Sequence, residues 1–526
     1  MGIFINRGNT DFQRILNGEY VDKTGLIAVV NKTLFSEQSM SCVTRCRRFG
    51  KSMAAKMLCA YYDDSCDSRS LFAGLEIEKD ASFEKHLNKY PVIYLDMTSF
   101  ITRFKGDDDI VSHIDQEVRD EMHTAFPDVP AVESDDLMAL LLRIVLNTGK
   151  PFFFIIDEWD AICREFPPDS KGMDSYVNWL RRMFKDVSAN TAFAGVYMTG
   201  ILPIKKYNTQ SALNNFLEYS MVRPGDMARY FGFTKDEVLQ LTEKHGADFD
   251  DMEKWYDGYL IGRERSMFNP NSVMQALREG WCQSYWSATG SFEAVAGYIN
   301  LDYEGLRSDI VHMLAGDRSE VNPKGFLNDL SEIRDRDDVL TALIHLGYLT
   351  YDRTTQECFI PNLEVSGEME SAVNANEWEG VTRALKQSRK LLEATLRGDS
   401  DYVAARLEEM HSESTSILEY NDENSLSCTI SIAYYYARND FQMIREMPTG
   451  KGYADIILLP RKHVNKPALV IELKKDCNVR AAIDQIKDRR YPQQVAEYTG
   501  DILLVGINYD TQTKQHTCQI ERWVKE

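Results

Sequence analysis

The alternation of apolar and polar residues divides the chain into regions of different character. Up to about residue 225, short apolar runs alternate with amphipathic stretches, a pattern typical of an α/β domain. Between about 226 and 375 the pattern is mostly helical and rich in aromatic residues, and a charged helical stretch follows at 373–411. We therefore expect a parallel sheet flanked by helices at the N-terminus, with strands at 41–44, 92–96, 152–157 and 192–199.

The C-terminal region, from about residue 412, alternates between helical and strand periodicity. Its pattern predicts a compact α/β unit built as helix, strand, strand, helix and strand. The expected ranges are 423–438, 454–459, 468–473, 479–498 and 502–507.

Composition and charge change this picture mainly by what they exclude. The ten cysteines form no C-x-x-C pair and the nine histidines no H-E-x-x-H, so a disulfide scaffold and a zinc hydrolase are disfavoured. The chain begins without an apolar leader and has no apolar run long enough for a bilayer, so we expect a cytoplasmic protein without a membrane partner. The net charge of −21 argues against a protein that coats nucleic acid, although a local basic groove would suffice.

A phosphate-binding loop is indicated after the first strand. The segment Arg45-Cys46-Arg47-Arg48-Phe49-Gly50-Lys51-Ser52 lies between strand 41–44 and a helix, the context that a P-loop requires. Loop amides including that of Gly50 would bind phosphate, Lys51 would bridge the β- and γ-phosphates, and Ser52 would reach Mg²⁺. Arg45 stands where the pattern G-x-x-x-x-G-K-[ST] has its first glycine. This departure leaves open the alternative that the loop is only a structural relic of a P-loop.

Carboxylates follow the apolar strand at 152–157. Because ligands bind at the carboxyl ends of parallel strands, we expect Asp157 to hold Mg²⁺ through water and Glu158 to polarise the attacking water. Thr199 ends the strand at 192–199 and would sense the γ-phosphate. The intact set of Lys51, Ser52, Asp157 and Glu158 argues against the view that the loop is a structural relic.

With these motifs in order, the chain resembles the bacterial AAA-ATPase-like family, which usually carries a PD-(D/E)XK nuclease domain at its C-terminus. In that family arginines stand in the phosphate loop, so the resemblance implies that Arg45, Arg47 and Arg48 belong to the ATP site. We interpret the aromatic W-Y-D-G-Y segment as structural. The matching segments are 20–24 (YVDKT), 47–52 (RRFGKS), 157–160 (DEWD), 199–201 (TGI), 255–259 (WYDGY), 269–270 (NP) and 346–349 (LGYL).

The C-terminal region contains a D…E-x-K arrangement. Asp455 opens one strand, and Glu472 and Lys474 share one face of the next because side chains two apart on a strand point the same way. If the strands pair, two carboxylates would hold Mg²⁺ or Mn²⁺ and Lys474 would orient or deprotonate water. The arrangement resembles the PD-(D/E)XK superfamily, which often adds a carboxylate (here Glu423) and a glutamine (here Gln485). Arg480, Lys487, Arg489 and Arg490 on the last helix would face a phosphate backbone.

We therefore predict a P-loop ATPase domain (1–225), a helical lid or winged-helix-like domain (226–375), a helical connector (376–411) and a nuclease domain (412–526). The first hypothesis is an ATP-controlled, metal-dependent hydrolase that cuts nucleic acid, DNA rather than RNA. The second is a nucleotide-dependent switch or scaffold whose nuclease fold only binds DNA or a partner. Acidic charge favours the second, and the intact Asp455, Glu472 and Lys474 favour the first. Assembly into a homo-oligomer is left open.

Overall fold

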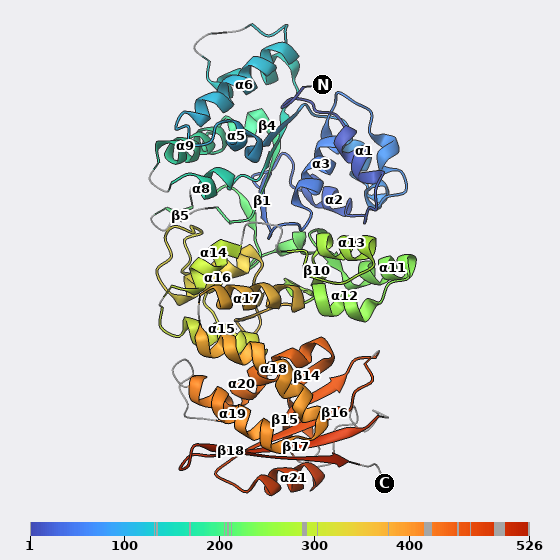
Figure 1. The fold of residues 1–526 in the computed structure, drawn as a ribbon. Coiled ribbons are helices and arrows are strands. Elements are labelled where there is room, and N and C mark those ends of the chain that lie inside the picture. The colour runs from blue at the N-terminus through green and yellow to red at the C-terminus, as the bar shows by residue number, and fades with distance from the viewer. Residues whose placement is uncertain are drawn as a thin grey trace. The chain divides into compact units, whose positions relative to one another are not determined.

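The computed structural model groups the chain into two compact units (Figure 1). Unit 1 comprises Met1–Ala288 and Glu320–Val365, and unit 2 comprises Thr289–Ser319 and Ser366–Glu526. The region expected to be a separate middle domain, 226–375, thus contributes to both units. The structure describes residues 2–130, 132, 135–167, 170–204, 206–207, 210–211, 213–286, 292–301, 303–376, 378–414, 423–449, 452–462, 464–488 and 500–523.

A five-stranded parallel sheet forms the centre of unit 1, in the order β2-β3-β4-β1-β7. The predicted α/β fold is therefore confirmed, and the four expected strands are found within a residue of their predicted bounds. The strands are β1 (Met40–Thr44), β2 (Val92–Asp96), β3 (Phe152–Asp157), β4 (Phe193–Gly200) and β7 (Leu217–Tyr219).

Strand β3 shows why this sheet is a middle layer. Its side chains are all buried, and successive residues alternate between two hydrophobic clusters. Phe153 and Ile155 pack with helices α2 (Gly25–Asn31) and α3 (Lys51–Tyr62). Phe152, Phe154 and Ile156 pack on the opposite face, and Figure 1 shows the two groups of helices on either side of the sheet. The helices of that second face include α5 (Met97–Arg103), α6 (Ile110–Ala125), α7 (Leu137–Thr148), α8 (Ala161–Glu165), α9 (Lys171–Lys185) and α10 (Ala189–Ala192).

The rest of unit 1 is helical with small antiparallel sheets. Strands β8 (Phe233–Thr234), β9 (Tyr259–Ile261) and β10 (Glu264–Phe268) form one of them, and β12 (Thr350–Asp352) pairs with β13 (Glu357–Phe359). These short strands lay outside the mostly helical prediction, because runs of two to five residues give little periodic signal. The helices are α11 (Lys235–His245), α12 (Phe249–Tyr256), α13 (Pro270–Glu279) and α16 (Arg336–Leu346), in addition to the N-terminal α1 (Thr10–Leu16) and α4 (Phe83–His86).

Unit 2 contains a mixed five-stranded sheet in the order β14-β15-β16-β17-β18. Strands β16 and β17 are parallel and the other pairs antiparallel, so the connection from β16 through α21 to β17 is a crossover. Ile483 and Ile486 of α21 pack on Val470 and Leu504 of the sheet. The strands are β14 (Phe441–Thr449), β15 (Gly452–Pro460), β16 (Ala468–Lys475), β17 (Ile502–Asp510) and β18 (Gln515–Trp523), and α21 spans Val479–Asp488.

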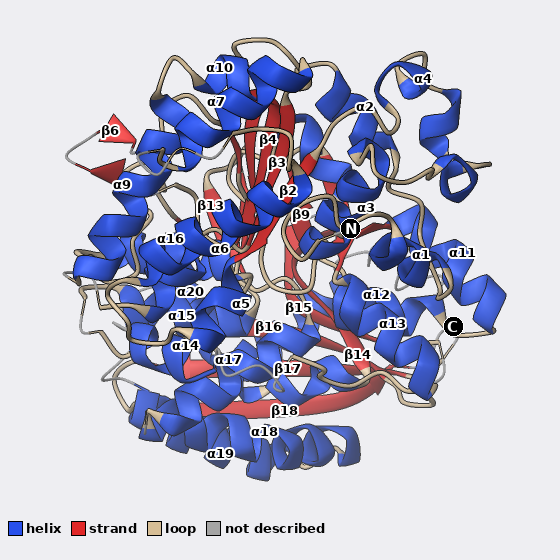
Figure 2. Ribbon diagram, turned by 90° about the horizontal axis from the view of Figure 1, so that it is seen from above, coloured by secondary structure: helices blue, strands red, loops and turns tan. Residues whose placement is uncertain are grey.

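Helices complete unit 2. The predicted charged stretch is helical, but it is divided at Gly398, which takes a left-handed conformation after α18. Figure 2 shows α18 and α19 beside β18, and α19 packs on that strand. The helices are α14 (Phe292–Ile299), α15 (Leu306–Ala315), α17 (Leu363–Ala375), α18 (Glu379–Arg397), α19 (Ser400–Ser414) and α20 (Glu423–Ala433). Within the part of the chain that the structure describes, no helix is long and apolar enough to cross a membrane.

Candidate functional site

The loop between β1 and α3 has the geometry that its sequence predicts. Gly50, at the N-cap of α3, has a φ of 89°, and a Cβ there would meet no atom within 4 Å, so backbone conformation alone favours glycine. The Lys51 side chain is only 4% exposed, and its Nζ donates to the carbonyl oxygen of Cys46 at 3.2 Å. Lys51 therefore crosses the loop from the first turn of α3, and Ser52 follows it at the wall of a cavity.

Asp157 at the end of β3 is held by two hydroxyl groups. Tyr94 on β2 donates to Oδ2 at 3.0 Å, and Thr199 on β4 donates to Oδ1. The amide of Glu158 donates to the Thr199 hydroxyl oxygen at 3.2 Å. Thr199 therefore fixes both acidic residues, and its sensing of the γ-phosphate stays a prediction. Burial, followed by the nearby charge of Asp157, raises the pKa of Asp96 at the end of β2.

Glu158 lies between two basic side chains. Its Oε1 is 3.5 Å from Lys51 Nζ, and its Oε2 accepts a hydrogen bond from Arg164 at 2.8 Å. Glu158 has a φ of 53°, a strained value for a non-glycine residue and one that is common near functional sites. Arg164 also donates to Asp160, whose carboxylate accepts the Ile201 amide. The sequence analysis missed Arg164, although its spacing of four from Asp160 on a helix is a signal for such a pair.

The three arginines of the loop lie in different environments. The side chain of Arg45 is fully buried and donates to the carbonyl oxygens of Thr44 (2.8 Å) and Tyr219 (2.9 Å). Arg47 and Arg48 line the cavity instead, and Arg48 donates to the Tyr285 carbonyl oxygen at 2.6 Å. Arg45 therefore supports the loop from the core side rather than from the cavity, and its expected membership of the ATP site stays a prediction.

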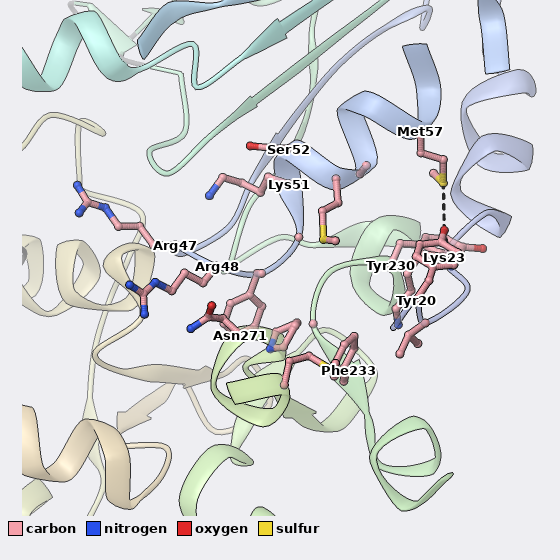
Figure 3. A pocket seen from close by; sticks show the side chains of 18 of the residues that line it. Tyr20, Lys23, Arg47, Arg48, Lys51, Ser52, Met57, Tyr230, Phe233 and Asn271 are labelled. Carbon is pink, nitrogen blue, oxygen red and sulfur yellow. Dashed lines mark hydrogen bonds between the residues drawn. The ribbon is translucent and has the colours of Figure 1, made fainter. Parts of the chain in front are cut away.

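A cavity of about 440 Å³ opens beside the loop (Figure 3). At one end it is polar, with Lys51, Ser52 and Glu158, and its other side is largely apolar and aromatic. In Figure 3 the Tyr20 hydroxyl meets the Met57 sulfur, at 3.6 Å. A site with a cationic end and a flat apolar end fits a phosphorylated ligand that carries a planar ring. The residues of the apolar side are Tyr20, Val21, Met57, Tyr230, Phe233 and Met274.

Two motifs far along the sequence support the loop. The Phe49 ring packs edge-on against Tyr259, with ring centroids 5.1 Å apart, and the Tyr259 hydroxyl donates to the Gly347 carbonyl oxygen at 2.9 Å. A Cβ on Gly347 would lie 2.5 Å from the Cβ of Cys46, so this glycine allows α16 to approach the loop. Gly258 has a structural role, as predicted for its segment, since a Cβ there would lie 2.0 Å from the Pro361 carbonyl oxygen.

A second constellation lies in unit 2. Glu472 on β16 is 2% exposed, and its Oε1 accepts hydrogen bonds from Lys474 Nζ (3.0 Å) and from Gln485 Nε2 on α21. The antiparallel register pairs Ile456 of β15 with Ile471 of β16, and Asp455 and Glu472 each lie one residue beyond this pair at the same end. The backbone therefore brings Asp455 opposite Glu472. The structure brings together Glu472, Lys474 and Gln485 as expected.

The other expected residues of this constellation are only partly described. Glu423 opens α20, as predicted, but the side chains of Glu423 and Asp455 lie outside what the structure describes. Lys487 pairs with Glu521 of β18 and Arg480 is exposed, and the expected place of these two residues at a phosphate backbone stays a prediction. Arg489 and Arg490 lie outside the described residues.

Both constellations lie within regions of the chain that match family models. Residues 7–209 match the model described as a predicted AAA-ATPase, AAA-ATPase-like, and residues 422–519 match the PD-(D/E)XK nuclease superfamily. This chain carries an AAA-ATPase-like domain and a PD-(D/E)XK nuclease superfamily domain. The AAA-ATPase-like match contains the loop, Asp157, Glu158 and Thr199, and the nuclease-superfamily match contains Glu472 and its partners.

Two solved structures show a distant likeness to the chain. The Aeropyrum pernix ORC2 protein, in ADPNP and ADP complexes, is 11% identical, covers 69% of this chain and 98% of its own, and has a TM-score of 0.29. The Aeropyrum pernix ORC1 protein in complex with DNA is 12% identical and has a TM-score of 0.24, and the match covers 88% of this chain and 94% of the ORC1 chain. No curated protein matches the chain. At this level the likeness carries no argument about function.

Proposed function

We propose that this protein is an ATP-controlled, metal-dependent nuclease that binds and hydrolyses ATP in unit 1 and cuts DNA phosphodiester bonds in unit 2. The observation that carries the proposal is the convergence of Lys474 and Gln485 on the buried carboxylate of Glu472. A carboxylate that is 2% exposed is costly unless charged and hydrogen-bonding partners compensate it, and the match to a nuclease superfamily supplies a reason for that cost.

The nucleotide half rests on the cavity beside the loop. Lys51 and the N-terminus of α3 would bind the β- and γ-phosphates, and the apolar side of the cavity would take the base. Ser52 and Asp157 supply the oxygen ligands that Mg²⁺ prefers, and Mg²⁺ would neutralise charge on the phosphates. Glu158, released from Lys51 as that lysine turns to phosphate, would orient the attacking water. Arg47 and Arg48 are proposed as further phosphate ligands.

The nuclease half rests on β15, β16 and α21. Asp455 and Glu472 would hold Mg²⁺ or Mn²⁺, with Glu423 as a third carboxylate, and the metal would lower the pKa of a bound water and stabilise charge on the phosphate. Lys474 would then hold or deprotonate that water. Gln485 would fix the orientation of the Glu472 carboxylate through its hydrogen bond.

A switch or scaffold that binds without cutting is the second candidate. The net charge of −21 and the pairing of Lys487 with Glu521 favour it, because both reduce the positive potential available to a nucleic acid. The two candidates differ in one observable, the appearance of new nucleic-acid ends.

The deciding experiment incubates the purified chain with linear DNA, circular DNA and RNA in Mg²⁺ or Mn²⁺, with and without ATP. We expect DNA cleavage that depends on metal and changes with ATP. Lys51→Ala should abolish the response to ATP but keep metal-dependent DNA cleavage. Glu158→Gln should bind ATP without hydrolysing it.

Two results would contradict different parts of the proposal. Absence of cleavage in every condition, with retained DNA binding, would favour the switch. Equal ATP affinity of Lys51→Ala and the natural chain, measured by calorimetry, would remove the nucleotide half.

A further inference from the structure

Three potential metal ligands meet in unit 2 among residues that neither proposed site uses. His312, Asp317 and Cys428 each offer one ligand atom, and these atoms all lie within 4.8 Å of one another. His312 Nδ1 is 3.0 Å from Asp317 Oδ2. The His312 and Asp317 side chains are each 28% exposed, whereas Cys428 is buried. The cluster is therefore open to an ion on one side and closed by the thiol on the other.

Regular structure holds these residues in place. His312 lies in the last turn of α15, and Gly316 follows with a left-handed φ of 101°. This turn brings the Asp317 amide to the His312 carbonyl oxygen at 2.9 Å, so the two side chains leave the same end of the helix. Cys428 belongs to α20, which packs on α15. His312 and Cys428 thus belong to helices, and Asp317 lies just beyond the end of α15, where its amide hydrogen bond to His312 limits its movement.

We propose that His312, Asp317 and Cys428 form a binding site for a borderline-soft divalent cation, with Zn²⁺ as the expected ion, which ties α15 to α20. A set of one nitrogen, one oxygen and one sulfur suits Zn²⁺, whereas Mg²⁺ prefers oxygen alone. Ligand atoms around tetrahedral zinc lie roughly 3.5 Å apart, so side-chain movements of about 1 Å would complete the site. The three protein ligands leave one coordination position for water.

The site is independent of both proposed activities. Its ligands lie outside the phosphate loop and outside Glu472 and its partners, so it would persist if the chain neither hydrolysed ATP nor cut DNA. Binding would stabilise unit 2 by mass action, since the unfolded chain does not hold the three ligands together.

Cobalt provides the test, because a thiolate bound to Co²⁺ gives a near-ultraviolet charge-transfer band and tetrahedral Co²⁺ absorbs strongly in the visible. The full chain is titrated with Co²⁺ in excess Mg²⁺, which occupies the oxygen-rich sites. We expect a band that saturates at one equivalent and disappears when Zn²⁺ is added. Cys428→Ser should remove the charge-transfer band, and His312→Asn should weaken Co²⁺ binding by about 100-fold or more, above the loss typical of outer residues.

The matched control is Cys477→Ser, which removes an exposed thiol of the same unit. This variant should keep the full cobalt spectrum. A band that survives in Cys428→Ser, disappears in Cys477→Ser, or never saturates at one equivalent would overturn the proposal. If Cys428→Ser fails to fold, His312→Asn decides the outcome, because it leaves the buried thiol in place and removes one half-exposed ligand.

Discussion

Replacing Gly347 by alanine tests whether the region beyond the ATPase-like match supports the phosphate loop. Gly347 ends α16 with a φ of 90°, and a Cβ there would lie 2.5 Å from the Cβ and 2.9 Å from the Sγ of Cys46. The nearest contact is a main-chain-attached carbon, which cannot rotate away. The loop or α16 must therefore move.

The expected cost has two parts. An alanine in the left-handed region costs about 1–2 kcal/mol, and overpacking a filled core typically costs a further 1–3 kcal/mol. Gly149→Ala is a matched control, because Gly149 also ends a helix of unit 1 in the left-handed region (φ of 70°) but a Cβ there meets no atom within 4 Å. Only the first part of the cost applies to Gly149. We expect Gly347→Ala to lower the free energy of unfolding by about 2–5 kcal/mol.

Two measurements check this reasoning. Urea unfolding followed by tryptophan fluorescence gives the stability of both variants, and calorimetry gives their affinity for ATP. Gly347→Ala should bind ATP more weakly, since Cys46 belongs to the loop and its carbonyl oxygen positions Lys51. Equal stabilities for the two variants, or unchanged ATP affinity in Gly347→Ala, would refute the proposed support.

Three further predictions concern single side chains. Thr199→Val keeps the shape of the side chain and removes its hydroxyl, so Asp157 loses a buried hydrogen-bond donor. The variant should slow ATP hydrolysis by at least about 10-fold and change ATP affinity less. Steady-state kinetics would measure kcat and calorimetry the affinity, and an unchanged kcat would contradict the prediction. Lys474→Ala should still bind metal, at least as tightly as the natural chain, and should slow DNA cleavage by roughly 100-fold, as for a lost acid–base group. A gel assay would measure this loss, and Lys475→Ala should behave like the natural chain in it. Burial raises the pKa of Asp257 to about 6, so between about pH 4 and pH 6 the folded chain holds a proton that the unfolded chain loses. The free energy of unfolding should therefore fall as pH rises through this range. Asp257→Asn should flatten this slope, as measured by urea unfolding.

Much of the architecture could be predicted because its signals are local and periodic. The strand at 152–157 is an unbroken apolar run, which indicates a fully buried central strand, and its structure has the predicted bounds. The alternation around Glu472 and Lys474 likewise placed both on one face of β16, where the structure has them in contact. The family resemblance was confirmed for the two matched regions.

Other features could not be predicted because they depend on distant contacts. Arg45 stands close to Arg47 and Arg48 in the sequence. Its side chain, however, is buried beneath the loop, where it donates to the carbonyl oxygen of Tyr219 on β7, a contact that no local pattern indicates. The approach of Gly347 to the loop joins residues about three hundred positions apart. Strands β14 and β18 at the edges of the second sheet were missed, since β18 mixes polar and apolar residues without clear alternation.

The carboxylates of Asp157 and Glu472 are stabilised in different ways, and this difference bears on how each would bind metal. Asp157 accepts hydrogen bonds from two neutral hydroxyl groups and has no ion pair among the described residues, so a divalent ion there would not have to displace a basic side chain. Glu472 is already paired with Lys474, which a metal ion must share or displace. We therefore expect metal to bind more weakly in unit 2 until a phosphate group draws Lys474 away. On this reasoning, nucleic acid and metal should bind cooperatively at Glu472, and Lys474→Ala should tighten metal binding in the absence of DNA.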